Sequence, residues 1–168
     1  MTPRTIRLTA RPADAGNWAP YGQIPLEETD PGNDTVISFQ WRDPHVNFIG
    51  HDFGEIRHNG TAAICDLLNR HDTATQTLMP MNVAALVVVA PASLDLSEPA
   101  HLDQIEAFVL RPLDCVNLAV GTWHWGPYPL APGRVRLLNI QGRRYAEDNK
   151  VAYLERDLGV VIEATAAQ

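Results

Sequence analysis

The chain has 168 residues, of which 45% are hydrophobic and 20% are charged, as in an ordinary soluble globular protein. It has 13 Lys and Arg residues against 20 Asp and Glu residues, which gives a net charge of -7. An acidic chain repels phosphate groups at long range, so nucleic acid and anionic membrane surfaces are not expected as partners. A small anionic substrate held by local arginines remains compatible with this charge.

Neither the first residues nor the apolar runs indicate a targeting or membrane segment. Residues 1–7 contain no apolar stretch of signal-peptide length, and the longest apolar run, 83–92, is far shorter than the roughly 20 residues of a membrane span. Cys65 and Cys115 lie far apart in apolar surroundings and are expected to be buried rather than bridged. We expect a cytoplasmic protein.

The first half of the chain predicts short elements separated by turns. Residues 4–10 alternate polar and apolar side chains, which is typical of a half-buried strand. Asp14 is a suitable N-cap for a short helix over residues 15–19, which Pro20 would end. A turn cluster and further short runs follow, namely the turn at 27–35, β-like pieces at 36–41 and 46–49, and a strand or short helix at 62–68.

The second half predicts strands more firmly. Apolar or alternating runs separated by turn residues lie at 75–80, 84–90, 105–110, 115–119 and 135–140. The β-branched run 87–89 indicates a strand buried on both faces. Many short strands at intervals of about ten residues, with no linker or repeat between them, predict a mainly β sandwich or barrel that forms one domain over residues 1–168.

Aromatic residues gather around a histidine between Gly121 and Leu130. We expect a bent loop here, in which Trp123 forms an apolar wall and His124 is shielded from water. Burial lowers the pKa of a histidine and keeps its imidazole neutral, so His124 could act as a general base or as a metal ligand. The alternative is structural: the tryptophans fill one end of the barrel and His124 bonds to a carbonyl.

A second polar group lies at the start of a predicted strand. His71, Thr75 and Gln76 place an imidazole, a hydroxyl and an amide near one strand end, where they could bind a small polar ligand in the mouth of a barrel. The alternative is a polar turn in which Asp72 and Thr73 satisfy backbone groups.

The remaining histidines and arginines are less specific. His45, His51 and His58 lack the spacing of the known metal motifs, so a metal centre is not expected. Arg134 and Arg136 would share one face of a strand. A guanidinium on that face suits a carboxylate if the face lines the barrel, and is merely solvated if it points outward.

Several of these residues form an ordered combination along the chain. It consists of His71, Thr75–Gln76, Met79–Met81, Val87–Pro91, Glu106–Val109, Val116–Asn117 and Trp123–His124. The combination resembles the ureidoglycolate lyase family of cupin-like β-barrels, over roughly residues 68–142. The resemblance implies a single-domain cupin-like β-barrel or sandwich with a few short helices.

The resemblance also implies an activity, the cleavage of ureidoglycolate to glyoxylate and urea, a late step in the recovery of purine nitrogen through allantoin. Such a carbon–nitrogen lyase acts on a small anionic substrate and needs a base but no redox cofactor. The implied roles are His124 as the base, His71 orienting the site, Thr75 and Gln76 holding the polar substrate, Trp123 walling the site and Arg134 binding the carboxylate.

The chain departs from the family where members usually continue the Trp-His pair with another His and a Pro, because Trp125–Gly126–Pro127 stands there. Two other functions therefore stay open. One is a non-catalytic cupin-like protein that binds a small carboxylate or a sugar. The other is a metal-dependent cupin enzyme that uses His71 and His124 with a third ligand. We also expect a homodimer, in which the first strand or residues 159–163 pair with a second copy.

Overall fold

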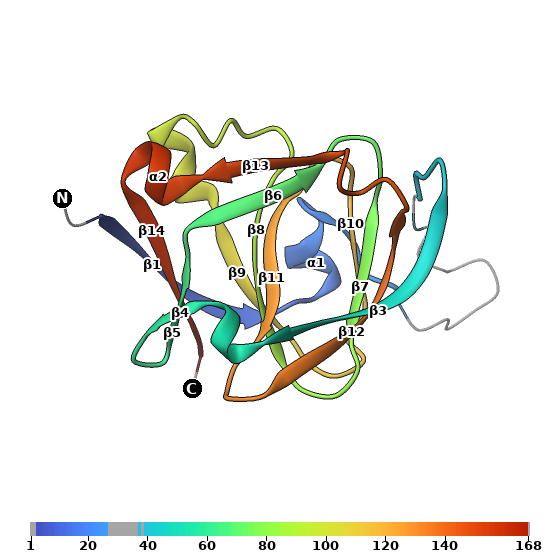
Figure 1. Cartoon of the computed structure of the whole chain (residues 1–168), viewed down its shortest axis with the longest axis horizontal. Coiled ribbons are helices and arrows are strands. Elements are labelled where there is room, and N and C mark those ends of the chain that lie inside the picture. The colour runs from blue at the N-terminus through green and yellow to red at the C-terminus, as the bar shows by residue number, and fades with distance from the viewer. Residues whose placement is uncertain (1–2, 27–36, 38, 168) are drawn as a thin grey trace.

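The computed structural model describes residues 3–26, 37 and 39–167 (Figure 1). In this part of the chain two β-sheets, one of nine strands and one of five, curl toward each other as a barrel. No helix among the described residues is long and apolar enough to cross a membrane.

The larger sheet is built around a strand that is buried on both faces. This strand, β8 (Ala85–Ala90), is buried at every residue, which confirms the interpretation of the valine run. Val87 and Val89 pack between the two sheets, and Val88 packs on the opposite face. In sheet order the strands are β13 (Asn149–Tyr153), β6 (Leu67–His71), β11 (Trp123–Pro129), β8, β9 (Glu106–Leu110), β1 (Arg4–Pro12), β14 (Val160–Ala166), β5 (Ala62–Cys65) and β4 (Arg57–Asn59).

The smaller sheet is antiparallel throughout. In sheet order its strands are β2 (Gly22–Gln23), β10 (Val116–Leu118), β7 (Gln76–Pro80), β12 (Arg134–Gly142) and β3 (Pro44–Asp52). β12 pairs with β3 along its whole length, from Arg134 opposite Asp52 to Gly142 opposite Pro44. On its other side β12 pairs with β7 as far as Ile140 opposite Thr77. These registers decide which side chains of the smaller sheet point into the barrel.

A short helix closes one region of the space between the sheets. As the sequence predicts, Asp14 caps this helix, because its side chain accepts the N–H groups of Gly16 and Asn17 at 2.9 Å. Trp18, at the end of this helix, is fully buried and packs edge-to-face on Phe108, with ring centroids 5.4 Å apart. The helical elements are α1 (Ala15–Trp18), α2 (Leu154–Leu158) and the 3-10 helices η1 (Phe53–Glu55) and η2 (Pro99–Gln104).

These two sheets confirm the prediction of a mainly β barrel or sandwich with a few short helices. The ambiguous segment 62–68 forms β5 and the start of β6, with a break between them at Asp66. Residues 37 and 39–41 lie in no strand, so the β-like interpretation of 36–41 is wrong for these residues. The other residues of that piece, and the turn cluster at 27–35, lie outside the described residues.

Within the segment 121–130, residues 123–129 form the strand β11 and not the bent loop that the sequence predicts. The pairing of β11 with β8 shifts register between Trp125 and Tyr128. Gly126 lies at this shift with a φ of 88°, and a Cβ there would lie 2.8 Å from the carbonyl oxygen of Leu86. Glycine and proline therefore produce a local irregularity in a paired strand rather than a loop.

The strands expected to pair with a second copy also pair within the chain. β1 lies parallel to β14, from Arg4 opposite Val160 to Ala10 opposite Ala166. On its other side β1 pairs with β9 at Arg11 and Pro12, and β14 pairs with β5 from Ile162 to Ala164.

Replacing Trp18 by alanine is expected to lower the free energy of unfolding by about 3–5 kcal/mol, because a large, fully buried ring is removed. Urea denaturation measures this loss, with Tyr153→Ala as the control, since the Tyr153 side chain is 37% exposed. Equal losses in the two variants would show that Trp18 does not anchor the core.

Candidate functional site

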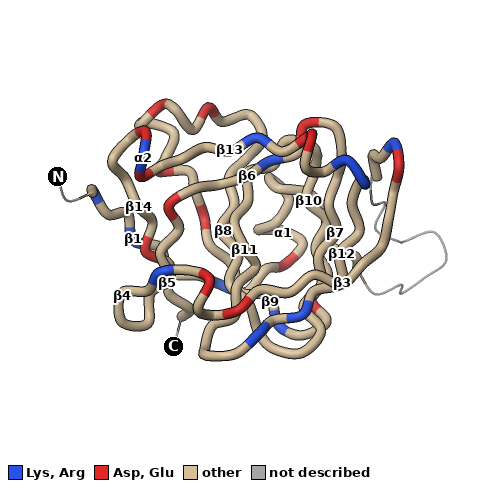
Figure 2. Tube along the Cα trace, viewed as in Figure 1, with Lys and Arg blue, Asp and Glu red and all other residues tan. Residues whose placement is uncertain are grey.

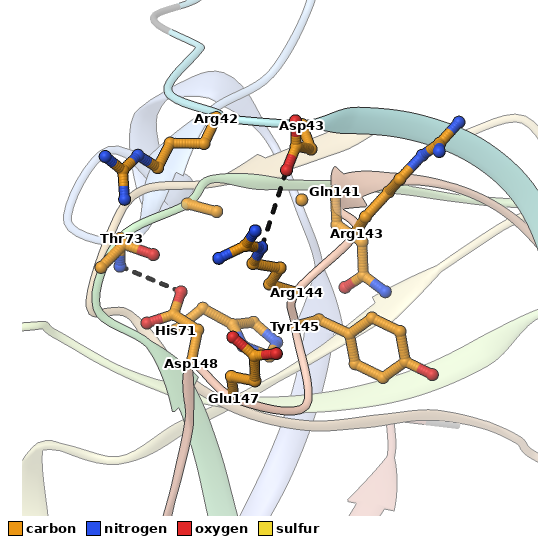
Figure 3. Close-up of a pocket in the computed structure, with 12 residues that line it drawn as sticks. Arg42, Asp43, His71, Thr73, Gln141, Arg143, Arg144, Tyr145, Glu147 and Asp148 are labelled. Atoms are coloured by element: carbon orange, nitrogen blue, oxygen red, sulfur yellow. Dashed lines mark hydrogen bonds and ion pairs between the residues drawn. The ribbon is translucent and has the colours of Figure 1, made fainter.

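A cavity of about 240 Å³ opens at one end of the barrel (Figure 3). β6 ends at His71, β7 begins at Gln76 and β12 ends at Gly142, so the polar residues at these strand ends gather around one opening. The charged residues that line it are Arg42, Asp43, Arg143, Arg144, Glu147 and Asp148.

Two histidines from neighbouring strands lie side by side, and one of them, His71, lines this cavity. The ladder between β6 and β11 sets His124 opposite Asn69, which places His71 and His124 on the same inward face. Their ring centroids are 5.4 Å apart. Together with Gln76 they line an inner chamber that is too small for a water molecule. Of the two histidines, His71 also lines the open cavity.

The tautomer of His124 follows from its one hydrogen bond. Its Nδ1 lies 3.1 Å from the carbonyl oxygen of Thr122, and a carbonyl can only accept. Nδ1 therefore carries the proton, and the lone pair of Nε2 is available as an acceptor or base.

Burial keeps both imidazoles neutral at pH 7. Burial lowers the pKa of His124 from its ordinary 6.5 to about 4, and the nearby His71 adds to this shift. The hydrogen bond to the Thr122 carbonyl opposes it. Burial also lowers the pKa of His71, while the carboxylates of Asp148 and Asp72 oppose this shift. At pH 7 the two neighbouring imidazoles are thus both uncharged.

Asp148 holds the turn that follows His71. Its carboxylate accepts the backbone N–H groups of Asp72 and Thr73 at 3.1 and 3.0 Å. The side chain of Asp72 is in turn paired with Lys150 and, at 2.8 Å, with Arg70. These contacts fix the end of β6 and so the position of the His71 ring.

The rim of the cavity carries arginines that can receive an anion. Charges of both signs meet at this end of the barrel (Figure 2). Arg144 pairs with Asp43 at 3.7 Å, whereas Arg42 and Arg143 have no carboxylate partner among the described residues. Figure 3 shows the guanidinium groups of Arg42 and Arg144 extending over the cavity, while that of Arg143 points away. Three arginines and three carboxylates line the cavity, so the net charge of -7 is not concentrated there.

Thr75 shapes the rim instead of lining the cavity. Its hydroxyl accepts the N–H of Gln40 at 3.1 Å, and its carbonyl accepts the indole N–H of Trp41 at 3.1 Å. These bonds anchor the segment that carries Arg42 and Asp43, so Thr75 positions the rim.

Gln76 belongs to a chain of buried amides. Its Nε2 donates to Oδ1 of Asn139 at 2.8 Å, and Nδ2 of Asn139 donates to Oδ1 of Asn47 at 2.8 Å. Within the described part of the chain, the buried atoms Gln76 Oε1, Gln141 Oε1 and His71 Nδ1 have no hydrogen-bond partner. Buried polar atoms without a partner are costly, so these three mark a place where a ligand can bind.

Two of the sequence-predicted site residues lie elsewhere. Trp123 faces the opposite side of β11 from His124, where its indole N–H donates to the carbonyl of Leu94 at 3.0 Å. Arg134 lies at the far end of β12, where it is exposed and paired with Asp52. The structure thus brings together His71, Gln76 and His124. Trp123, the predicted wall, and Arg134, the predicted carboxylate-binding residue, lie outside this group.

The other histidines do not converge. His45 bonds through Nδ1 to the carbonyl of Gln141 at 3.1 Å, His51 pairs with Glu55 at 3.0 Å, and His58 stacks on Phe53. In the described ranges no group of three or more His, Cys, Asp or Glu side chains is placed to hold a metal ion.

Sequence reasoning missed the residues that line the cavity beside the histidines. Arg143 and Arg144 follow the end of a predicted strand, and Arg42 precedes another, but nothing in the sequence shows that the two ends meet. One signal was present: Asn139 and Gln141 are polar at alternate positions in the apolar part of the strand, after Leu137 and Leu138, which indicates buried polar groups on one face.

The low pKa of His124 makes stability depend on pH. Because the folded pKa of about 4 lies below the unfolded value of 6.5, this contribution to stability is fully present above pH 6.5. It is lost progressively as the pH falls from 6.5 to about 4, by roughly 3 kcal/mol. Urea denaturation at pH 7.5 and 4.5 should show a smaller difference for His124→Asn than for the wild type. Equal differences would mean that His124 does not titrate in this way.

The chain is similar in sequence to a known family and in fold to a solved structure. The sequence matches the family model described as ureidoglycolate lyase over residues 34–161. No curated protein matches the chain. Among solved structures, a dTDP sugar isomerase from Desulfovibrio desulfuricans G20 is similar, with 11% identity, a TM-score of 0.45 and coverage of 79% of this chain and 85% of that chain. Because the family match spans most of its length, the chain belongs to the ureidoglycolate lyase family.

Proposed function

We propose that this protein is a ureidoglycolate lyase, which cleaves ureidoglycolate to glyoxylate and urea. The observation that supports the proposal is a pair of neutral imidazoles, one of which, His71, lines a cavity with arginines at its rim. Membership of the family supports the choice of substrate. A cavity of about 240 Å³ is also large enough for a molecule of this size.

The reaction requires one proton to move from oxygen to nitrogen. In ureidoglycolate a single carbon carries the hydroxyl and the ureido nitrogen, and the bond from this carbon to nitrogen breaks. The hydroxyl loses its proton and becomes the aldehyde oxygen of glyoxylate, while the nitrogen gains a proton and leaves as part of urea. A neutral imidazole that accepts the proton and then returns it can perform both transfers.

We assign this proton transfer to His71, in place of the His124 that the sequence pattern favoured. His71 lines the open cavity, whereas His124 lies in the inner chamber. Asp148 and Asp72 oppose the lowering of the His71 pKa, while the pKa of His124 falls to about 4. A base is more effective when its pKa lies near the working pH, which favours His71. His124 takes the orienting role, with its Nε2 as a fixed acceptor.

We assign the substrate carboxylate to the arginines of the rim. Arg42 has no carboxylate partner among the described residues, and Arg144 is held only at 3.7 Å by Asp43. A carboxylate that bridges their guanidinium groups gains charge-assisted hydrogen bonds. It would hold the reacting carbon above His71, so the anion is positioned before any proton moves.

Purified protein is expected to release glyoxylate from ureidoglycolate well above the uncatalysed rate. His71→Asn removes the proton carrier and should lower kcat by at least about 100-fold. His124→Asn should lower kcat less, since that residue only orients. The proposal fails if the wild type releases glyoxylate no faster than buffer; binding without release would instead indicate a non-catalytic carboxylate-binding protein.

The role of the rim arginines is tested by comparing the KM of variants at the rim with the KM of a variant at the opposite end of β12. Arg42→Ala and Arg144→Ala should each raise KM by about tenfold, because each removes a charge-assisted bond to the carboxylate. Arg134→Ala, at an exposed arginine far from the cavity, should leave KM unchanged. Steady-state kinetics decides between the two ends, and a raised KM in Arg134→Ala alone would contradict the assignment.

A further inference from the structure

The two carboxylates that act on the His71 ring differ in their charge partners. Asp72 is ion-paired with Lys150 and, at 2.8 Å, with Arg70. Asp148 forms no ion pair with a Lys, Arg or His side chain among the described residues. Of the two, Asp148 opposes the lowering of the His71 pKa more strongly. The negative charge of Asp148 is therefore left uncompensated near the histidine.

Backbone groups hold the Asp148 carboxylate without neutralising it. Its two oxygens accept the N–H groups of Asp72 and Thr73 at 3.1 and 3.0 Å, and Figure 3 shows the bond to Thr73. These donors carry no net charge. Strand β13 begins one residue later, with Asn149 opposite His71, so Asp148 lies at the strand end beside the histidine. The carboxylate is thereby fixed near the ring while its charge stays unpaired.

The turn that carries Asp148 also carries a rim arginine. The carbonyl of Arg144 accepts the backbone N–H groups of Glu147 and Asp148 at 3.0 and 3.1 Å. This turn and the bonds to Asp72 and Thr73 hold Asp148 from both sides. The position of its carboxylate therefore depends on backbone hydrogen bonds and not on contacts between surface side chains.

Proton transfer gives His71 a positive charge that its surroundings disfavour. In the proposed reaction the ring takes the proton of the substrate hydroxyl, becomes an imidazolium, and then returns the proton to the ureido nitrogen. Burial disfavours the imidazolium, and the neighbouring His124 is neutral at pH 7 and supplies no counter-charge. An uncompensated carboxylate near the ring offsets the effect of burial. The charged residues that line the cavity besides Asp148 are Arg42, Asp43, Arg143, Arg144 and Glu147.

We propose that Asp148 is the counter-ion of His71: it positions the turn after the histidine and stabilises the imidazolium while the ring carries the proton. Asp72 is not suited to this role, because Lys150 and Arg70 already neutralise it. The part that Asp148 plays in catalysis rests on the proposed function. The attraction between Asp148 and a protonated His71 is a property of the protein without substrate, and it can be measured separately.

Nitrogen-15 NMR of histidine-labelled protein tests the counter-ion without any turnover. Asp148→Asn removes the charge but keeps an oxygen that accepts an N–H group, and it should lower the pKa of His71 by at least about half a pH unit. Glu147→Gln is the matched control, since it removes the same charge from an exposed side chain on the same turn. It should leave the pKa of His71 within about 0.2 pH units. An unchanged His71 pKa in Asp148→Asn, or equal shifts in the two variants, would overturn the proposal.

A second measurement uses the wild-type protein alone, so it does not depend on the folding of a variant. The carboxyl carbon-13 signal of Asp148 should move as His71 is titrated, because the new positive charge changes the electric field at the carboxylate. The corresponding signal of Glu147 should move less at that pH. An Asp148 signal that does not respond when His71 titrates would contradict the proposal.

Kinetics separates a counter-ion from a purely structural residue. Asp148→Asn should lower kcat by about three- to tenfold, the factor that a pKa change of about half to one pH unit represents, with KM within about twofold. The acidic limb of the pH profile of kcat/KM should move to lower pH, because a base with a lower pKa stays unprotonated to lower pH. Asp148→Glu, which retains the charge, should keep the limb close to its wild-type position. A loss of kcat that is equal at every pH, with the limb unmoved, would assign Asp148 to structure alone.

Cleavage and titration can fail independently. If the wild type does not cleave ureidoglycolate but Asp148→Asn lowers the pKa of His71, the proposed function falls and the counter-ion stands. If ureidoglycolate is cleaved and His71 titrates alike in the wild type and in Asp148→Asn, the counter-ion falls and the proposed function stands.

Discussion

The candidate site depends on the burial of two imidazoles side by side, 5.4 Å apart, in a chamber that excludes water. Two positive charges at this distance with little solvent would repel strongly, so the pair is stable only when at least one ring is neutral. The hydrogen bond from His124 to the Thr122 carbonyl fixes the position of one ring. Asp148 fixes the turn that follows β6, and this turn sets the position of His71. The arginines at the rim and the buried amides of Gln76 and Asn139 lie next to this neutral pair.

The barrel produces this arrangement by joining the ends of strands that are distant in sequence. β6 and β11 place the histidines on one inward face, and β7 and β12 place the glutamines on the facing sheet. Trp123, beside His124 in sequence, faces the opposite side of the same strand and packs in a separate core. One strand therefore serves both purposes: alternate residues stabilise the fold and furnish the site.

Local patterns predicted much of the fold. The Asp14 cap, the doubly buried run 87–89 and most of the strands follow from short-range chemistry that the neighbouring residues reveal. The pairing of His71, Gln76 and His124 was also predictable, because the family resemblance gave their order. Arg42, Arg144 and Gln141 were not, since their meeting depends on the register between strands and on which ends of the barrel coincide. The sequence favoured Arg134 as the carboxylate-binding residue, but it lies at the end of β12 away from the cavity. The alternation of residues shows which face of a strand a side chain occupies, but not which end of the strand reaches the cavity.

The charge state of the two histidines is the central claim, and nitrogen-15 NMR of histidine-labelled protein measures it directly. Titration from pH 8 to 4 should show both rings neutral at pH 7, with His124 protonated only at Nδ1 and titrating near 4. His71 should titrate below the ordinary 6.5. An imidazolium signal from either residue at pH 7, or a His124 that carries its proton on Nε2, would contradict this account.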